Sequence, residues 1–423
     1  MKKFILFMLA FLVAACGNIQ VPQSPALKFF ERKSGLIAYI GIDGNVYITD
    51  QAATSTTPLT EDITEETQGN ILYQLPTWSH DGGQLAFIRL EQSGGTITSN
   101  LMVSNVDDDT VTNVYTSNSE YPFYLSWSPD NQNIGALSTT AQKQTLLLQN
   151  IPADGSERQL LDTGSPFYWS WSPDGSAMIV HKNGAAENGL NQISFLKFDD
   201  ELIEYVMKTA PASFQAPAWS PDGAFILLTA IAEDGEQQIV LADSTGAIQR
   251  HLAGFDLNTA FAWATDSEHF AYIVGEEQMS NGVLGALHVA NINNAEEIVV
   301  DKKVYGFFWS PDNAELAYFV PGVATSEDSS EQTLYFELNI LDIASGESRV
   351  IATYQPTEEF ANILPYIDQY HQSFTIWSPD SYNLVISFMN PQTGTPAIAI
   401  VPSSGVTEPR FLAEGSLGVW SWK

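Results

Sequence analysis

Short apolar runs separated by polar turns fill the chain from residue 35 onward. Residues 85–88, 225–228 and 270–273 are typical, since each holds four consecutive apolar residues between polar segments. Runs of this length, rich in branched and aromatic side chains, are typical of strands, whereas helices need ten or more residues. The pattern therefore predicts an all-β chain of short antiparallel strands.

One phrase, Trp-Ser-Pro-Asp-Gly or a close variant, recurs directly before such runs. Proline presets φ for a turn, Asp and Asn tolerate unusual backbone angles, and glycine accepts a positive φ. The phrase is thus predicted to be a tight turn that follows a strand ending in tryptophan. Its copies recur at roughly 45–50 residues, with one longer interval, a period typical of repeat proteins. The repeat tryptophans are Trp78, Trp127, Trp171, Trp219, Trp263, Trp309 and Trp377, and we assign Trp422 to the same place.

Each period has room for four strands. After the turn at Trp219, for example, residues 225–228 are a predicted second strand, 238–243 a third and 248–252 a fourth. Four strands per period are typical of a propeller blade. These residues resemble the TolB-type propeller repeat with its Trp-Ser-Pro-Asp-Gly signature. The resemblance covers nearly all of residues 35–423 and implies a single β-propeller of four-stranded antiparallel blades, but it implies little about function.

The number of blades depends on the chain ends. Residues 36–40, 45–49 and 58–60 look like second, third and fourth strands that lack a preceding tryptophan phrase. Residues 419–422 look like a first strand with nothing after it. We therefore expect both termini to pair in one closing blade, which gives eight blades. Seven is the alternative if the degenerate copy of the phrase at Trp263 or the long unit after Trp309 is not a blade.

The N-terminus has the features of an export signal. Lys2 and Lys3 precede an apolar run at 4–14, which is too short to span a bilayer, and small residues then precede Cys16. This stretch resembles the lipobox of bacterial lipoproteins. The resemblance implies a signal peptide at 1–15, a lipidated Cys16, and anchoring to the outer face of the cytoplasmic membrane or to the outer membrane. Residues 16–34 would be a flexible tether and 35–423 the propeller. An ordinary signal peptide with a stray cysteine is the alternative.

The charge balance limits the partners. The chain holds 50 acidic and 17 basic residues, a formal net charge of −33. Such a surface repels nucleic-acid phosphates and anionic headgroups, so we expect no nucleic acid and membrane contact through the lipid anchor only. Cationic ligands and basic partners remain compatible. The acidic turns 107–109 and 199–201 could hold calcium, although acidic turns are more often simply solvated. We expect no other cofactor.

The long interstrand segments are predicted to lie on one face of the propeller. They are residues 61–70, 91–99, 182–191, 275–285, 321–332 and 354–372. Long loops on one side of a rigid scaffold usually carry binding functions, so we expect the ligand on that face.

The longest of these segments supplies the predicted site. Thr357 is expected to cap a short helix with Glu358 and Glu359 in its first turn. The residues that follow are expected to enter the next first strand and to line the channel mouth, together with aromatic residues of other first strands. Packing between blades is the alternative. The predicted ligand-binding residues are Tyr124, Tyr168, Phe308, Tyr366, Asp368, Tyr370 and His371.

Catalytic motifs are missing from the sequence. There is no Gly-x-Ser-x-Gly elbow and no His-Glu-x-x-His, and the six histidines show no pair at ligand spacing. We therefore assign no catalytic or metal-binding residue. We predict a membrane-anchored, non-enzymatic propeller that binds an envelope or extracellular protein, peptide or glycan as a scaffold or accessory subunit. The alternatives are a metal-dependent, lyase-like carbohydrate-active enzyme with its site at the channel, as in some TolB-like propellers, and a structural surface protein.

Overall fold

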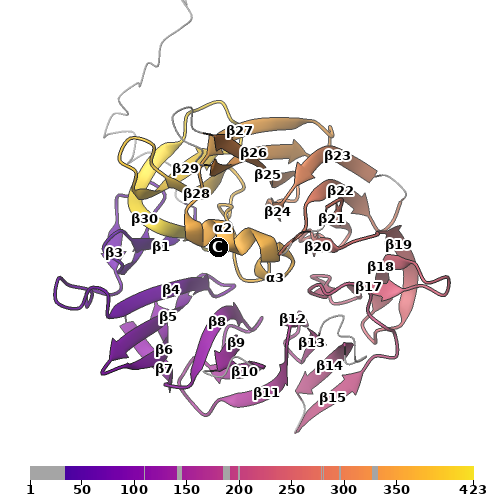
Figure 1. Cartoon of the computed structure of the whole chain (residues 1–423), viewed down its shortest axis with the longest axis horizontal. Helices are drawn as coiled ribbons and strands as arrows, with labels where there is room; N and C mark the ends of the chain where they lie inside the picture. Colours follow the sequence, from indigo (N-terminus) through magenta and orange to yellow (C-terminus); the bar gives the residue numbers. More distant parts are fainter. Residues whose placement is uncertain are drawn as a thin grey trace, which may run out of the picture. The chain divides into compact units, whose positions relative to one another are not determined.

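The predicted strands form sheets that stand in a ring around a common axis (Figure 1). The computed structural model describes residues 34–108, 110–140, 145–183, 191–198, 201–277, 279, 281–294, 297–325 and 332–423. The predicted signal peptide, Cys16 and all of the tether except Ser34 lie outside these residues. No helix among the described residues is long and apolar enough to cross a membrane.

Six of the sheets have four antiparallel strands each, as the repeat predicts. In chain order they begin with β4 (Ile71–Trp78), β5 (Gln84–Ser93), β6 (Thr96–Asn105) and β7 (Thr110–Ser117), then β8 (Glu120–Trp127), β9 (Asn133–Thr140), β10 (Leu146–Pro152) and β11 (Gln159–Gly164), then β12 (Phe167–Trp171), β13 (Ala177–Lys182), β14 (Gln192–Phe198) and β15 (Leu202–Val206). The other three comprise β16 (Ala218–Trp219), β17 (Phe225–Ile231), β18 (Gln237–Asp243) and β19 (Ile248–Gly254), then β20 (Thr259–Trp263), β21 (His269–Gly275), β22 (Gly285–Asn291) and β23 (Glu297–Val304), then β24 (Gly306–Trp309), β25 (Glu315–Thr325), β26 (Gln332–Asp342) and β27 (Ser348–Tyr354).

The seventh sheet corrects the predicted blade count. It has six strands in the order β28 (Asn383–Met389), β29 (Pro396–Pro402), β30 (Arg410–Trp420), β1 (Ile37–Gly41), β2 (Val46–Thr49) and β3 (Thr56–Pro58). The propeller formed by the described residues therefore has seven sheets, and the predictions of eight blades and of a separate closing blade made by both termini are wrong. The reason is that β30 is one long strand: its first half pairs with β29 and its second half with β1. The copies at Trp263 and Trp309 both start true sheets.

The recurring phrase forms the predicted turn in every copy. The residue after the aspartate has a positive φ whether or not it is glycine, for example +72° at Gly82 and +60° at Asn131. In most copies the serine hydroxyl donates to the aspartate carboxylate, as Ser79 does to Asp81 at 2.7 Å. The same serine oxygen accepts the backbone N–H five residues later, which starts the second strand. This local bonding explains how the phrase forms a turn without help from distant residues.

The repeat tryptophans join neighbouring sheets. The indole N–H of Trp127 donates to the carbonyl of Thr77, the residue before Trp78, at 2.9 Å. Trp78, Trp263, Trp309 and Trp377 bond to the preceding sheet in the same way. In contrast, the buried indole N–H groups of Trp171 and Trp219 have no acceptor among the described residues.

The assignment of Trp422 to the repeat is wrong. Trp78 donates to the carbonyl of Val419, the residue before Trp420, so Trp420 holds the repeat position. Trp420 is fully buried and lies opposite Ile37 in the pairing of β30 with β1, whereas Trp422 is half-buried. Trp420-Ser421 therefore corresponds to Trp171-Ser172 of the repeat, two residues before the predicted position.

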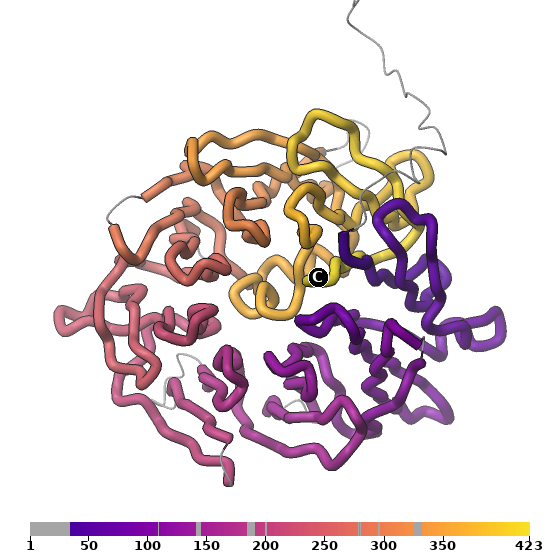
Figure 2. Tube along the Cα trace, turned by 180° about the vertical axis from the view of Figure 1, so that it is seen from behind, coloured from indigo at the N-terminus to yellow at the C-terminus, as the bar shows by residue number. Residues whose placement is uncertain are grey.

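A helical segment occupies the centre of the ring. It comprises α2 (Glu358–Ile363), a 3-10 turn η1 (Leu364–Tyr366) and α3 (Ile367–Tyr370), and we call residues 357–372 the axial plug (Figures 1 and 2). The predicted cap is confirmed, because the side chain of Thr357 accepts from the backbone N–H of Phe360. The prediction that the residues after this helix enter a first strand is wrong, since they continue as helix.

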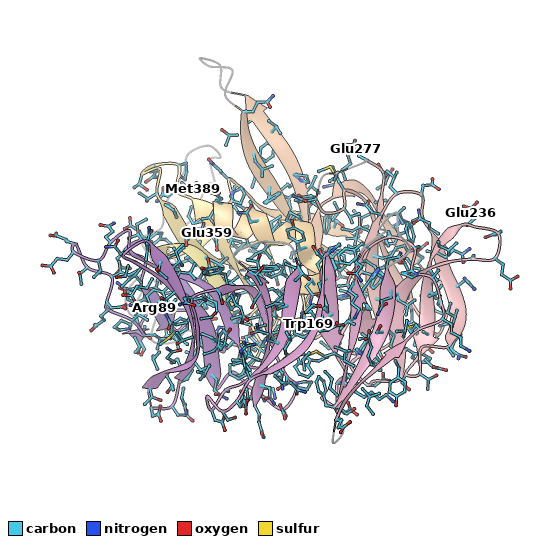
Figure 3. The ribbon with its side chains drawn as sticks, turned by 60° about the horizontal axis from the view of Figure 1, so that its bottom comes forward. Arg89, Trp169, Glu236, Glu277, Glu359 and Met389 are labelled. Atoms are coloured by element: carbon cyan, nitrogen blue, oxygen red, sulfur yellow. The ribbon has the colours of Figure 1, made fainter. Side chains whose placement is uncertain are left out.

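Several of the long segments lie on one side of the ring. Glu277 and Glu359 lie in such segments, and they point to the same side in Figure 3 as the β25–β26 hairpin. Glu236 and Met389, which lie at the ends of other connections between second and third strands, are on that side as well. The axial plug enters the ring from this long-loop face.

Candidate functional site

The axial plug is held by hydrogen bonds to three separate parts of the ring. The side-chain amide of Gln369 accepts from the backbone N–H of Trp169 at 2.9 Å and donates to its carbonyl at 2.8 Å. The hydroxyl of Tyr124 donates to the backbone carbonyl of Gln369 at 2.9 Å. Asp368 accepts the backbone N–H of Ala216 at 2.7 Å. These buried bonds fix the plug against β8, β12 and the segment before β16.

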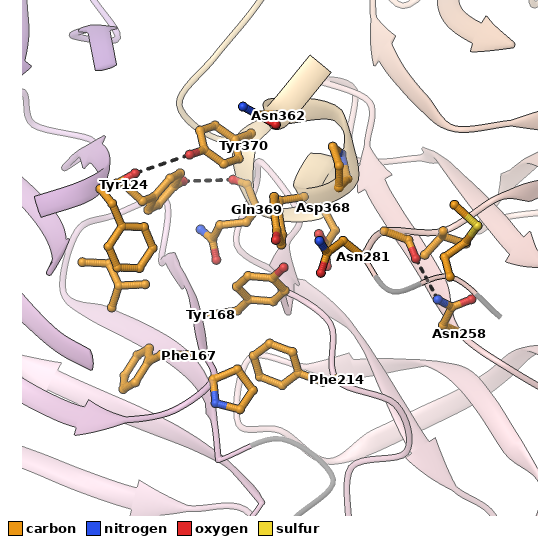
Figure 4. Close-up of a pocket in the computed structure, with 18 of the residues that line it drawn as sticks. Tyr124, Phe167, Tyr168, Phe214, Asn258, Asn281, Asn362, Asp368, Gln369 and Tyr370 are labelled. Carbon is orange, nitrogen blue, oxygen red and sulfur yellow. Dashed lines mark hydrogen bonds between the residues drawn. The ribbon is translucent and has the colours of Figure 1, made fainter. Parts of the chain in front are cut away.

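A pocket of about 600 Å³, which we call the axial pocket, lies beside the axial plug on the long-loop face (Figure 4). Five of the seven predicted ligand-binding residues line it together: Tyr124, Tyr168, Tyr366, Asp368 and Tyr370. They come from β8, β12 and the plug, which are far apart in the sequence. The volume falls within the range of small-ligand sites, and the wall combines aromatic rings with a few polar groups.

Aromatic pairs form one side of this pocket. Tyr168 stacks on Phe214, with ring centroids 4.5 Å apart and planes at 26°. Tyr124 meets Tyr370 edge to face at 5.0 Å and 81°. Rings in such pairs are stiff and present a flat apolar surface at low entropic cost. The wall is thus preformed.

The other two predicted residues lie elsewhere. Phe308 and His371 line a separate cavity of about 200 Å³ that is bordered by Thr265, Pro311 and Pro379 of the turns between first and second strands. This cavity is therefore on the short-turn side of the plug. Phe308 is only 4% exposed and packs against Phe319 and Phe374, so the alternative of packing between blades describes it better.

Burial changes the acidity of the plug residues. It raises the pKa of Asp368 to about 6, although the N–H of Ala216 favours the ionised form. Burial also lowers the pKa of His371 to about 4, while its imidazole contacts the carbonyl of Ile367 at 3.0 Å. The pKa of Tyr124 rises to about 12 for the same reason. At neutral pH the plug therefore carries an ionised carboxylate and a neutral imidazole.

Sequence reasoning missed several pocket residues. Phe214 lies in the segment that leads into the first strand ending at Trp219. An aromatic residue at that position could have suggested a pocket residue. No sequence pattern points to the residues with amide side chains, because Gln369 and three asparagines resemble ordinary loop residues. Asn258 donates to the carbonyl of Gly282 at 2.9 Å and so fixes the opposite rim. The asparagines that line the pocket are Asn258, Asn281 and Asn362.

No group of three or more His, Cys, Asp or Glu gathers at metal-binding distance within the described part of the chain. Of the two acidic turns, Asp109, Asp199 and Asp200 lie outside the described residues. Asp108 accepts from the backbone and hydroxyl of Thr110, so its carboxylate serves the turn itself. We therefore assign no ligand to a metal or cofactor.

Comparison with known proteins supports the fold. No protein-family model matches the chain, and no curated protein matches it. A crystal structure of the eukaryotic initiation factor is similar with a TM-score of 0.52 and 13% identity, over 92% of this chain and 98% of that one. An oligogalacturonate lyase in complex with manganese is similar with a TM-score of 0.51 and 12% identity, over 89% and 99% of the two chains.

TolB proteins are also among the similar structures. TolB from Acinetobacter baumannii matches 79% of this chain and 81% of its own, with 14% identity and a TM-score of 0.36. Identities this low show the β-propeller fold alone. The functions of these proteins therefore assign no role to the pocket.

Proposed function

We propose that the protein is a non-enzymatic binding protein that takes a segment of a protein, peptide or glycan into the axial pocket. The observation that carries this proposal is the pocket itself, a preformed cavity of about 600 Å³ at the centre of the long-loop face. Its aromatic rings offer stacking surfaces and its asparagines offer both donors and acceptors. These groups suit a ligand that is partly apolar and partly polar.

The attachment of the axial plug supports this role. Gln369 and Asp368 bond to backbone groups of the ring, and these bonds hold the wall in place before any ligand arrives. A binding site that is already rigid loses less conformational entropy when it closes on a ligand. The pocket is therefore suited to selective binding of a small part of a larger molecule.

The proposal includes an extracytoplasmic location. The lipobox-like sequence around Cys16 and the resemblance of the repeat to TolB-type propellers support a lipid-anchored scaffold or accessory subunit of an envelope system. Replacement of Cys16 by serine should abolish incorporation of labelled palmitate and release the protein from membranes. Retention of both in Cys16→Ser would contradict the anchor without affecting the pocket.

Obstruction of the pocket tests the binding proposal directly. Asn281 is exposed at the pocket and Gln392 is exposed in a segment between second and third strands away from it, so Asn281→Trp and Gln392→Trp form a matched pair. Residues 16–423 with Cys16 replaced would be applied to peptide and glycan arrays. We expect selective binding that Asn281→Trp abolishes and Gln392→Trp preserves. Binding that survives Asn281→Trp would place the ligand elsewhere, and no binding at all would favour a purely structural protein.

A further inference from the structure

Among the described residues, the wall of the axial pocket carries one negative charge and no positive one. Asp368 is the only acidic residue there, and no lysine, arginine or histidine lines the pocket among the described residues. Asp368 is 6% exposed, and the backbone N–H of Ala216 bonds to its Oδ2 atom. A carboxylate buried this far is costly when it has no counter-charge.

Three basic side chains on or next to the elements that line the pocket do not supply that counter-charge. Lys182, which lies opposite Phe167 in the β12–β13 pairing, contacts Asp162 at 2.6 Å and Glu204 at 2.9 Å, so two carboxylates already neutralise it. Burial lowers the pKa of His181, which lies against Phe214, and leaves its imidazole neutral. His371, next to the same stretch of the plug, is neutral as well because its pKa is about 4.

Aromatic rings line the same pocket as this carboxylate. Tyr168 stacks on Phe214, and its hydroxyl points towards the part of the axial plug that holds Asp368 (Figure 4). The electron-rich faces of tyrosine and phenylalanine attract cations, and the attraction grows when water is excluded. Aromatic faces beside an uncompensated carboxylate form a site for a positively charged organic group.

We propose that the axial pocket selects an organic cation, with its ammonium or guanidinium group held between Asp368 and the aromatic rings around Tyr168. This inference rests on the proposed binding function and names the chemical class of its ligand. The cation is either a small ammonium compound or a lysine or arginine side chain of a peptide. The chain's formal net charge of −33 acts in the same direction, because it attracts cations from solution.

Pairs of charged and uncharged probes of similar shape test the proposal. The probes are choline against 3,3-dimethylbutan-1-ol, and N-acetyl-lysine methylamide against N-acetyl-norleucine methylamide, titrated by calorimetry into residues 16–423. We expect each cation to bind at least about tenfold more tightly than its uncharged partner. A stronger response to choline indicates a small-molecule ligand, and a stronger response to the lysine probe indicates a peptide.

Asp368→Asn is the matched variant, because an asparagine oxygen can still accept from Ala216 while the charge is lost. It should weaken cation binding about tenfold and leave the uncharged probes unchanged. A carboxyl carbon titration by NMR provides a second readout in the unaltered protein, in which saturating cation should lower the pKa of Asp368. Equal affinities for charged and uncharged probes, or a pKa of Asp368 that does not change, would overturn the proposal that the ligand is a cation. A neutral glycan that binds and is blocked by Asn281→Trp would then leave the proposed function standing.

Discussion

The side-chain amide of Gln369 occupies both backbone hydrogen-bonding groups of Trp169, a residue 200 positions away in the chain. Trp169 lies on β12, a first strand whose partner in the sheet is β13. The amide therefore acts as a short substitute for a neighbouring strand, and it does so at the centre of the ring.

Replacement of Gln369 by methionine keeps the length of the side chain and removes both bonds. Each buried backbone group left unpaired costs about 1–3 kcal/mol, so we expect a loss of about 2–5 kcal/mol in the free energy of unfolding, measured with urea. Gln372→Met is the control, since the side chain of Gln372, in the same plug, makes one long contact of 3.5 Å to the carbonyl of Asp368. Equal losses in the two variants would contradict the bracing role of Gln369.

Trp127 and Trp422 should differ strongly when each is replaced by alanine. Trp127 is 1% exposed and bonds to Thr77, so its loss should cost about 3–5 kcal/mol. Trp422 is half-buried and lies outside the repeat position, so its loss should cost about 1 kcal/mol. Chemical denaturation measures both, and a larger loss for Trp422→Ala would restore its assignment to the repeat.

Asp368 and His371 should make opposite contributions to the pH dependence of stability. The folded pKa of Asp368 is raised to about 6, so its contribution to stability is present in acid and is lost as pH rises from about 4 to 6. The folded pKa of His371 is lowered to about 4, so its contribution is lost as pH falls from about 6.5 to 4. Each slope reaches at most about 1.4 kcal/mol per pH unit, and the two oppose each other in the wild type.

The single variants separate these two slopes. Relative to the wild type, Asp368→Asn should lose stability as pH falls through this window, and His371→Asn should lose stability as pH rises through it. Urea unfolding at half-unit steps between pH 4 and 7 provides the curves. Parallel curves for both variants and the wild type would mean that neither group has a shifted pKa.

Gly282 should resist substitution because of its position against the plug. Its φ is +77°, and a Cβ atom there would lie 2.8 Å from the Cα of Pro365. Gly235 has a φ of +89° with nothing within 4 Å, so Gly235→Ala measures the backbone strain alone. We expect about 1 kcal/mol for Gly235→Ala and clearly more for Gly282→Ala by thermal unfolding. Similar costs would show that the plug moves aside freely.

The sequence predicted the parts of the fold that local bonding determines. Every tryptophan phrase is a turn, because the aspartate, the residue with positive φ and, in most copies, the serine act within a few positions of one another. The length of β30 could not be predicted in this way. Whether a strand ends or continues into the next pairing depends on partners at both chain ends, such as Ile37 opposite Trp420.

The candidate site was predictable as a set of residue types and not as a geometry. Tyr124, Tyr168 and Asp368 were expected at a binding site, and they do line one pocket. Their arrangement depends on the side-chain amide of Gln369, which bonds to Trp169, 200 positions away, and such a distant contact leaves no periodic pattern in the sequence. For the same reason the helix after Thr357 was predicted from its cap, while its path across the ring was not.

The indole N–H groups of Trp171 and Trp219 have no acceptor among the described residues, so we expect one sector of the ring to be held less strongly than the rest. Both joints of the sheet β12–β15 lack the indole bond that links other neighbours, and the plug attaches at this sector through Trp169 and Ala216. Local opening follows the least bonded elements, so amide hydrogens of β12 and β13 should exchange early. A ligand that contacts both this wall and the plug would then hold the two together. Slower amide exchange in these two strands would show that the ligand is bound.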